Sequence, residues 1–455
     1  MNEMTAGEIA KITGGRLLCG DPDTVICGLC IDSRVAKEGD LFVPIVGAKV
    51  DGHRFIESVL EKAAATLTSI HRDVVVSEKP YIFVEDTVRA MQDIGAYARN
   101  SFTGPIVGVT GSVGKTTTRE MIATALSGCA KTYRTKKNLN SQIGVPITLF
   151  EMDADAECAV VEMGMSEVGE MERLSEMVRP DICVITMIGV AHIENLGSKE
   201  AIRREKLAIT SHMNPDGVLF LNGDDALLKE MKGRTLCNTL YYGTAPWCEY
   251  RAENIRMTDD YMYAYDYVHK DERIPVLLNT LGAHNVTNSL AGMAVADYLG
   301  HDLHKTAKTF ESFQGLRQKV IRVPGKYTII DDTYNASPDS MIASINVLAD
   351  IKTEGRKIAV LGDMFELGPD SEKYHYQVGE YLATKDIDEL VVVGELSGKI
   401  RQAVEDAGAS IKCYSFKDNG EVVLYLMSVM NPEDIALIKA SNGMHLDEIV
   451  RNMLG

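Results

Sequence analysis

The sequence predicts an α/β protein built from three domains. We expect a small mixed α/β domain at residues 1–84, a central parallel sheet covered by helices on both faces at residues 85–319, and a doubly wound domain at residues 320–455. Three observations support this prediction. The chain of 455 residues is too long for one core. Short β-branched runs alternate with helical stretches, and a glycine-rich turn joins one such run to a helix.

Composition narrows the classes of partner. The formal net charge of −18 argues against nucleic acid or an anionic membrane as the main partner. The N-terminus lacks a basic segment followed by an apolar one, and no run of about 18 uncharged apolar residues occurs, which predicts a cytoplasmic protein without membrane insertion.

The nine cysteines are scattered along the sequence, a distribution that is typical of free thiols. The lone pair Cys27 and Cys30 has metal-like spacing, but it lacks a second pair and fits buried structural thiols better.

The N-terminal region is rich in tight turns. Thr5 and Glu8 form a plausible capping box before a short helix that ends at Gly14-Gly15. After a strand, Asp32-Ser33-Arg34 offers a hydroxyl and a guanidinium to an anionic ligand. Alone, this triplet fits a solvated turn better.

A phosphate-binding loop is predicted at residues 106–120, IVGVTGSVGKTTTRE. An apolar strand stops at Gly111-Ser112-Val113-Gly114, and Lys115-Thr116-Thr117 opens a helix. The glycines let backbone N–H groups turn toward phosphate oxygens, Lys115 would reach the β/γ-phosphates, and Thr116 would hold Mg²⁺. Val109 stands where the longer pattern has glycine, so the loop is the shorter GxxGK[ST] form. The alternative is a glycine turn beside a surface lysine. The flanking strand and helix favour a central domain of the P-loop ATPase type.

Two further polar residues follow predicted strands of the central sheet. Glu162 follows the apolar residues 158–161 in the run at 158–163, and His192 follows the run at 181–188, with helices predicted near 170–177 and 199–212. Ligands of such sheets gather at the carboxyl ends of the strands. A carboxylate and an imidazole there fit Mg²⁺ ligation, directly or through water. The alternative is ordinary polar side chains at strand ends.

A third alternating block begins near Val320. Its apolar runs predict strands at 326–331, 357–362, 389–394 and 434–440, with helices between them. This order predicts a Rossmann-like unit, although the GxGxxG fingerprint of a dinucleotide site is absent from the sequence.

Together these motifs resemble the ATP-dependent Mur ligases, which build the peptide of bacterial peptidoglycan. Marks shared across that family lie at residues 111–117, Glu162–Gly164, Ala191-His192, 282–288 and Arg317. The stretches at residues 138–146, 331–341 and 361–368 are similar to the members that join D-Ala-D-Ala to UDP-MurNAc-tripeptide. The likeness covers nearly the whole chain in order.

The resemblance implies ATP and Mg²⁺ as cofactors, UDP-MurNAc-tripeptide and D-Ala-D-Ala as substrates, and a monomer. It implies that Lys115, His192 and Lys206 are catalytic, and that Thr116, Glu162, His192 and Lys206 serve the metal. The loop residues Gly111 to Thr117 would bind ATP phosphates, Asn285 adenine, Arg317 the γ-phosphate and Asp331 the ribose. Substrate contacts would come from Asp32, Ser33, Arg34, Asn140, Ser141, Asn335 and Ser337. Lys206 matches a lysine that the family carbamylates to hold a second metal. The alternative is one more helix-surface lysine.

Four positions depart from the family pattern. Met187 and Ser337 stand in place of asparagine, Lys137 in place of glycine, and Asn442 in place of arginine. Asparagine cannot pair with a carboxylate bidentately, so the last change bears on substrate recognition.

Three alternative functions stay open at this point. The first is a sister ligase that adds a single amino acid, although an Asp-Asn-Pro-Arg motif is absent from the sequence. The second is a nucleotide-binding module without ligase activity. The third is a simple P-loop kinase, which would leave two domains without a purpose.

Overall fold

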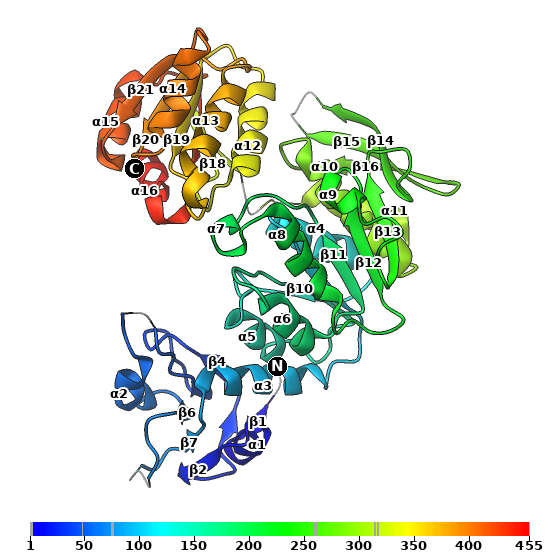
Figure 1. The fold of residues 1–455 in the computed structure, drawn as a ribbon, viewed down its shortest axis with the longest axis vertical. Coiled ribbons are helices and arrows are strands. Elements are labelled where there is room, and N and C mark those ends of the chain that lie inside the picture. Colours follow the sequence, from blue (N-terminus) through cyan, green and yellow to red (C-terminus); the bar gives the residue numbers. More distant parts are fainter. Residues whose placement is uncertain are drawn as a thin grey trace. The chain divides into compact units, whose positions relative to one another are not determined.

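The structure is a computed structural model that describes residues 3–47, 49–73, 77–258, 262–313, 315 and 318–454. Its contacts divide the chain into two compact units. Figure 1 labels the helices and strands. One contains residues 1–110, 130–184 and 205–219, and the other contains residues 111–129, 185–204 and 220–455. The predicted domain boundaries after residues 84 and 319 stay predictions.

The N-terminal residues form a five-stranded sheet with helices on both faces. Helix α1 (Ala6–Ile12) begins at the predicted capping box, in which the Thr5 hydroxyl accepts from the Glu8 N–H and the Glu8 carboxylate accepts from the Thr5 N–H. The strand order is β2-β7-β6-β5-β4, antiparallel between β2 and β7 and parallel elsewhere. The strands are β2 (Arg16–Cys19), β4 (Gly28–Cys30), β5 (Asp40–Phe42), β6 (Ala65–Thr68) and β7 (Tyr81–Phe83). One face packs against α1 and α3 (Thr87–Arg99), and the other against α2 (Ile56–Leu60).

Helix α3 precedes β8, the strand that leads into the phosphate loop. Asp86 caps its N-terminus by accepting from the N–H groups of Val88 and Arg89. The helix packs against α5 (Gly144–Phe150) and α6 (Glu170–Val178). A Cβ on Gly95 would lie 2.6 Å from Pro146 Cα, so glycine permits the close approach of α3 and α5.

A nine-stranded sheet forms the middle of the chain. Its order is β16-β15-β14-β13-β12-β11-β8-β10-β9. Strands β9, β10 and β8 are parallel, as are β13 and β14, which agrees with the predicted parallel sheet. Strands β14, β15 and β16 are antiparallel, an extension that the sequence analysis did not predict. The strands are β8 (Ile106–Thr110), β9 (Thr132–Arg134), β10 (Cys158–Glu162), β11 (Ile182–Ile185), β12 (Val218–Asn222), β13 (Asn238–Gly243), β14 (Tyr250–Met257), β15 (Tyr263–His269) and β16 (Glu272–Leu278).

Two predicted elements of this region are shorter than the sequence pattern. Strand β11 ends at Ile185, because the following residues Thr186 to Ile188 hydrogen-bond to loops. The helix predicted at 199–212 is α8 (Lys199–Leu207), followed by a 3-10 turn at Ala208–Thr210.

The C-terminal residues form a six-stranded sheet in the order β17-β18-β22-β19-β20-β21. The four predicted strands are present as β18 (Tyr327–Asp331), β19 (Lys357–Gly362), β20 (Glu389–Val393) and β22 (Ile435–Lys439), and β17 (Lys319–Val323) and β21 (Lys412–Phe416) lie at the edges. Successive apolar residues point to opposite faces, so Ala359 and Leu361 pack in one core while Ile358 and Val360 pack in the other. Helices α12 (Pro338–Asp350), α13 (Ser371–Leu382) and α14 (Gly398–Asp406) cover the first face; α15 (Asn419–Val429) and α16 (Asp447–Leu454) cover the second. Two-sided burial explains the continuous apolar runs that predicted these strands.

Among the described residues, the longest apolar helices fall short of what a membrane crossing requires.

Candidate active site

The predicted strand, loop and helix are present. Strand β8 ends at Thr110, and helix α4 (Lys115–Ser127) begins directly after Gly114, which has φ 85°. The first turn of α4 therefore adjoins the loop, and its N–H groups form the positive end of a helix dipole.

Both loop glycines are required by geometry. Gly111 has φ 153°, and a Cβ there would lie 1.8 Å from Thr186 Oγ1. A Cβ on Gly114 would lie 3.1 Å from Asn288 Oδ1. These positions keep the backbone clear of side chains, and a phosphate-binding loop needs the same clearance for close approach of an anion.

Backbone and side-chain hydrogen bonds both anchor the loop. The Ser112 N–H donates to Met187 O at 2.8 Å, and the Thr186 hydroxyl donates to Val113 O at 2.6 Å. Because Met187 contributes its backbone carbonyl, this contact does not depend on the asparagine that the family usually has there. The Lys115 ammonium donates to Gly111 O at 2.8 Å and to Ser112 O at 3.3 Å, so it lies over the loop.

A hydrogen-bond chain links α4 to α10 (His284–Tyr298). The Thr118 hydroxyl donates to Asn288 Oδ1 at 3.0 Å, and Asn288 Nδ2 donates to Asn285 Oδ1 at 2.9 Å. Asn285 is itself held, because its Nδ2 donates to Leu281 O at 2.7 Å. These hydrogen bonds fix Asn285, the predicted adenine contact, relative to the helix that carries Lys115.

Glu162 lies at the carboxyl end of β10, and parallel pairing places it opposite Val109 of β8. Its side chain is 1% exposed, and its Oε1 accepts from Asn140 Nδ2 at 2.7 Å. Thr110 is the last residue of the neighbouring strand β8, and its Oγ1 is buried with no hydrogen-bond partner within the described part of the chain. An orphaned hydroxyl and a buried carboxylate at the ends of two paired strands are unusual for strand ends that serve only the fold.

Lys206 is 1% exposed. The alternative interpretation of a helix-surface lysine is therefore wrong. Its neighbour Glu205 is also buried, and Glu205 Oε1 accepts from the Met171 N–H at 3.0 Å. Lysines are rarely buried without partners, so this position has a specific environment.

His192 adopts a left-handed conformation with φ 62° at the start of α7 (Ile193–Leu196). Its Nδ1 lies 2.7 Å from Glu366 Oε2, and this contact lowers the pKa of the Glu366 carboxyl.

The predicted metal residues divide between the two units: Glu162 and Lys206 belong to one, Thr116 and His192 to the other. Among the residues that the structure describes, there is no group of three or more His, Cys, Asp or Glu side chains suited to a metal ion. A hydroxyl and a carboxylate nevertheless fit a hard cation that takes most of its ligands from phosphates and water. Cys27 and Cys30 are both free thiols; Cys30 is buried, as predicted, whereas Cys27 is partly exposed.

Asp32 and Arg34 bind each other. Arg34 Nε and Nη2 donate to the two carboxylate oxygens of Asp32 at 2.9 and 2.6 Å. These side-chain hydrogen bonds lower the pKa of Asp32 to about 2. The Arg34 side chain is 85% exposed, so it presents remaining N–H donors to solvent. Ser33 lies between them, partly buried.

The C-terminal candidates lie on one loop after β18. The Asp331 carboxylate accepts from the N–H and hydroxyl of Thr333, and Asn335 is exposed. Ser337 forms a capping box with Ser340 at the start of α12. Serine and asparagine are both favoured N-caps, so Ser337 caps α12 as the family's asparagine would.

The remaining candidates are Ser141, Thr117 and Arg317. Ser141 is exposed at the end of the loop that carries Asn140. Thr117 lies in the first turn of α4. Arg317 lies outside the described residues.

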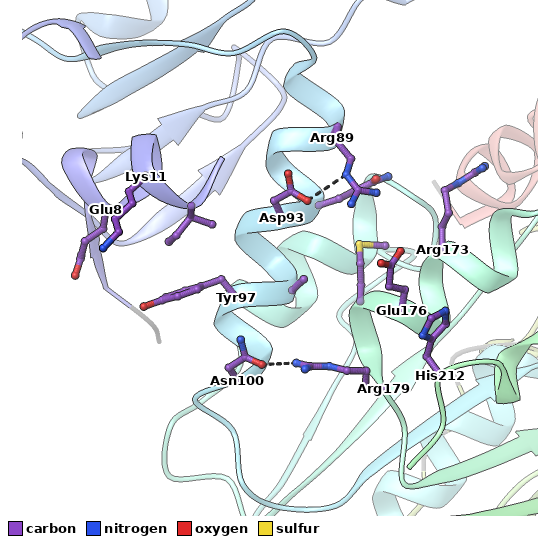
Figure 2. Close-up of a pocket in the computed structure, with 14 residues that line it drawn as sticks. Glu8, Lys11, Arg89, Asp93, Tyr97, Asn100, Arg173, Glu176, Arg179 and His212 are labelled. Carbon is purple, nitrogen blue, oxygen red and sulfur yellow. Dashed lines mark hydrogen bonds and ion pairs between the residues drawn. The ribbon is translucent and has the colours of Figure 1, made fainter. Parts of the chain in front are cut away.

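A separate cavity of about 710 Å³ lies along one side of α3 (Figure 2). Figure 2 shows Arg89 beside Asp93 on this helix and Arg179 reaching Asn100. No predicted site residue lines the cavity. Its Lys and Arg side chains are nearly balanced by Asp and Glu side chains, so its charge selects no anion. The lining residues are Glu8, Lys11, Ile12, Arg89, Gln92, Asp93, Ala96, Tyr97, Asn100, Arg173, Glu176, Met177, Arg179 and His212.

The sequence analysis did not assign roles to Thr110, Thr186 or Asn288. Thr110 directly follows the apolar run that predicts β8, a signal that would have placed it at the site edge, whereas Thr186 lies inside the predicted run at 181–188 and follows only the shorter observed strand β11. Asn288 lies three residues after Asn285, the spacing that puts two side chains on one helix face.

The fold and this strand, loop and helix define a P-loop-type α/β protein. Three family models match the chain: "Mur ligase middle domain" at residues 109–296, "Mur ligase, glutamate ligase domain" at residues 316–442, and "Mur ligase family, catalytic domain" at residues 25–98. A relative from Bacillus subtilis (strain 168), named UDP-N-acetylmuramoyl-tripeptide--D-alanyl-D-alanine ligase, is 33% identical over 100% of this chain and 99% of its own length. The chain belongs to the Mur ligase family.

Solved structures agree with this assignment. A crystal structure of MurF from Acinetobacter baumannii matches with a TM-score of 0.90 at 29% identity, covering 100% of this chain and 99% of that chain. MurF ligase from Thermotoga maritima in complex with ADP matches with a TM-score of 0.79 at 28% identity, covering 94% of this chain and 97% of that chain.

Proposed function

We propose that this chain is an ATP-dependent ligase that joins D-Ala-D-Ala to UDP-MurNAc-tripeptide in the cytoplasm, acting as a monomer with the three domains predicted from its sequence. The observation that supports this most strongly is the end-to-end likeness to ligases named for that reaction, in a chain whose phosphate loop has the required glycine geometry. The proposed substrates are those in the names of the relatives. The glycine geometry of the loop is the physical reason to expect that ATP binds.

The chemistry explains why ATP is needed. A carboxylate and an amine do not condense at neutral pH, because the leaving group would be oxide. In the proposed reaction a carboxylate oxygen of the tripeptide attacks the γ-phosphorus of ATP, and ADP leaves. The dipeptide amine then attacks the acyl carbon, inorganic phosphate leaves, and the nitrogen gives up a proton.

In this scheme the residues of the loop have defined tasks. Backbone N–H groups of residues 111–116 would bind phosphate oxygens, and Lys115 would exchange its contacts with Gly111 O and Ser112 O for the β/γ-phosphates. Asn285 would contact adenine, Asp331 the ribose, and Arg317 the γ-phosphate. These are roles carried over from the family and proposed for this chain.

We propose that Thr116, Glu162, His192 and carbamylated Lys206 hold Mg²⁺. The burial of Glu162 and Lys206 and the orphaned hydroxyl of Thr110 support a ligand at this strand end. When bound, the metal supplies positive charge that offsets repulsion between the triphosphate and the incoming carboxylate. The tripeptide nucleotide would contact Asp32, Ser33, Arg34, Asn140 and Ser141; the dipeptide would contact Asn335 and Ser337.

The test is a coupled assay for ADP and phosphate release with ATP, UDP-MurNAc-tripeptide and an amine. We expect turnover with D-Ala-D-Ala and little with single amino acids, whereas the reverse result would identify a sister ligase. Lys115→Ala should abolish turnover, and Lys131→Ala, which removes an exposed lysine paired with Asp155, should not. Retained turnover in Lys115→Ala would reject the proposed site.

A further inference from the structure

The C-terminal sheet contains a buried ion pair at the base of the loop that carries Asn335. Lys439, the last residue of β22, is 2% exposed, and Asp332 is 5% exposed. Lys439 Nζ lies 2.8 Å from Asp332 Oδ2 and donates to Asn335 O at 2.9 Å. The Lys439 ammonium therefore bonds both to the side chain of Asp332, the first residue of the loop, and to the backbone carbonyl of Asn335, in the exposed middle of the loop.

Strand pairing explains why these groups meet. Strands β18 and β22 are parallel, with Asp331 opposite Ile438, so Asp332 and Lys439 leave the sheet side by side. The Asp332 N–H donates to Ile438 O at 3.1 Å. The Ser344 hydroxyl of α12 donates to the same Asp332 oxygen at 2.5 Å. The loop is thus tied to β22 and to α12 by one carboxylate.

Stability alone is a weak reason for such a pair. Removing two charges from water is costly, and well-packed apolar residues often stabilise a core as well or better. What the pair adds is a defined main-chain conformation, because the Asn335 carbonyl is held by a charged donor.

We propose that Lys439, through Asp332, is a positioning residue for the amine substrate: the pair fixes the loop at residues 332–337 on which the dipeptide binds. This inference rests on the proposed function. Lys439 does not touch the substrate, and it acts through the conformation of Asn335.

The chain offers a control at the opposite end of the strands of the same sheet. Lys357, the first residue of β19, is 8% exposed, and its Nζ bonds to Ala349 O at 2.7 Å and Asp386 Oδ2 at 3.1 Å. Because β19 and β22 are parallel neighbours, Lys357 lies at the amino end of the sheet and Lys439 at the carboxyl end. Lys357→Met and Lys439→Met each remove one buried ammonium, at opposite ends of the strands, but the partner of Lys357, Asp386, is exposed whereas Asp332 is buried.

The experiment measures KM for D-Ala-D-Ala, KM for ATP, kcat and the melting temperature. For Lys439→Met we expect a rise of about tenfold in the dipeptide KM with the ATP KM changed by less than about twofold. Lys439→Arg should restore the dipeptide KM to within about threefold of wild type. Lys357→Met should lower the melting temperature without changing the dipeptide KM.

An unchanged dipeptide KM in Lys439→Met, or an equal rise in Lys357→Met, would overturn the inference. If Lys439→Met does not fold, Ser344→Ala removes one bond to Asp332, and we expect a rise of about threefold in the same KM; no change would reject the proposal. Failure of the wild-type enzyme with D-Ala-D-Ala would instead reject the proposed function.

Discussion

Asn140 holds the carboxylate of Glu162: its Nδ2 donates to Glu162 Oε1 at 2.7 Å, inside a site where Glu162 is 1% exposed. Asn140 also accepts from the Gly164 N–H through its backbone carbonyl at 2.7 Å. The two residues are 22 positions apart in sequence, and the bond joins a loop before α5 to the end of β10. A proposed metal ligand is therefore oriented by a proposed substrate contact.

Removing the Asn140 amide should weaken metal use. For Asn140→Ala we expect the Mg²⁺ concentration for half-maximal turnover to rise about tenfold, because outer partners of metal ligands typically contribute that much. The measurement is turnover against Mg²⁺ concentration. Asn138→Ala, an exposed change in the same loop, is the control. An identical Mg²⁺ dependence in Asn140→Ala and wild type would show that the bond serves only the fold.

Adding one methyl group to the loop should abolish nucleotide binding. A Cβ on Gly111 would lie 1.8 Å from Thr186 Oγ1, so Gly111→Ala must displace the loop. We expect a loss of about 100-fold or more in ADP affinity by calorimetry. Gly233→Ala is the control, because Gly233 also has a positive φ of 72° but no atom within 4 Å of its Cβ position. Normal ADP binding by Gly111→Ala would contradict the assignment of the loop.

The sequence predicted the elements around the site better than the contacts within it. Continuous apolar runs, separated by helical stretches, predicted β8, β10 and the strands of the C-terminal sheet, because a strand that is buried on both faces has an uninterrupted apolar sequence. The glycines of the loop were equally visible. The antiparallel strands β14 to β16 were missed, since nothing local in their pattern sets strand order.

Contacts between distant residues could not be predicted. The bond of Asn140 to Glu162, the chain from Thr118 to Asn285, and the burial of Lys439 against Asp332 depend on how strands pair in space. Local chemistry also left Lys206 ambiguous, and only its burial excluded the surface alternative.

Asp339 should make stability depend on pH. Its Oδ2 is buried without a hydrogen-bond partner in the described residues, and burial raises its pKa. A raised pKa in the folded state means that the charged form costs stability above that pKa, and that this cost disappears as pH falls below the unfolded value near 3.9.

Asp339→Asn should therefore raise the free energy of unfolding by about 1 kcal/mol at pH 8 and leave it nearly unchanged near pH 3. Urea unfolding at both pH values checks this. Asp370→Asn, an exposed change at the start of α13, should have no effect at either pH. A gain for Asp339→Asn that is the same at both pH values would contradict the explanation.

Lys137 should be replaceable by the family's glycine with a gain in stability. It has φ 52° and is exposed. Left-handed backbone costs a non-glycine residue about 1 kcal/mol, so Lys137→Gly should stabilise by up to about 1 kcal/mol. Asn138→Gly, at an ordinary φ, should instead destabilise slightly. Thermal unfolding of both variants decides whether backbone strain explains this departure.

The proposed reaction joins a dipeptide to a nucleotide-linked tripeptide at the expense of ATP. The most direct measurement is mass spectrometry of the nucleotide product after incubation with ATP, Mg²⁺, UDP-MurNAc-tripeptide and D-Ala-D-Ala, with ADP quantified in the same sample. We predict a product extended by one dipeptide with loss of water, and one ADP formed per product. An unextended tripeptide nucleotide, or extension without ADP, would contradict the account.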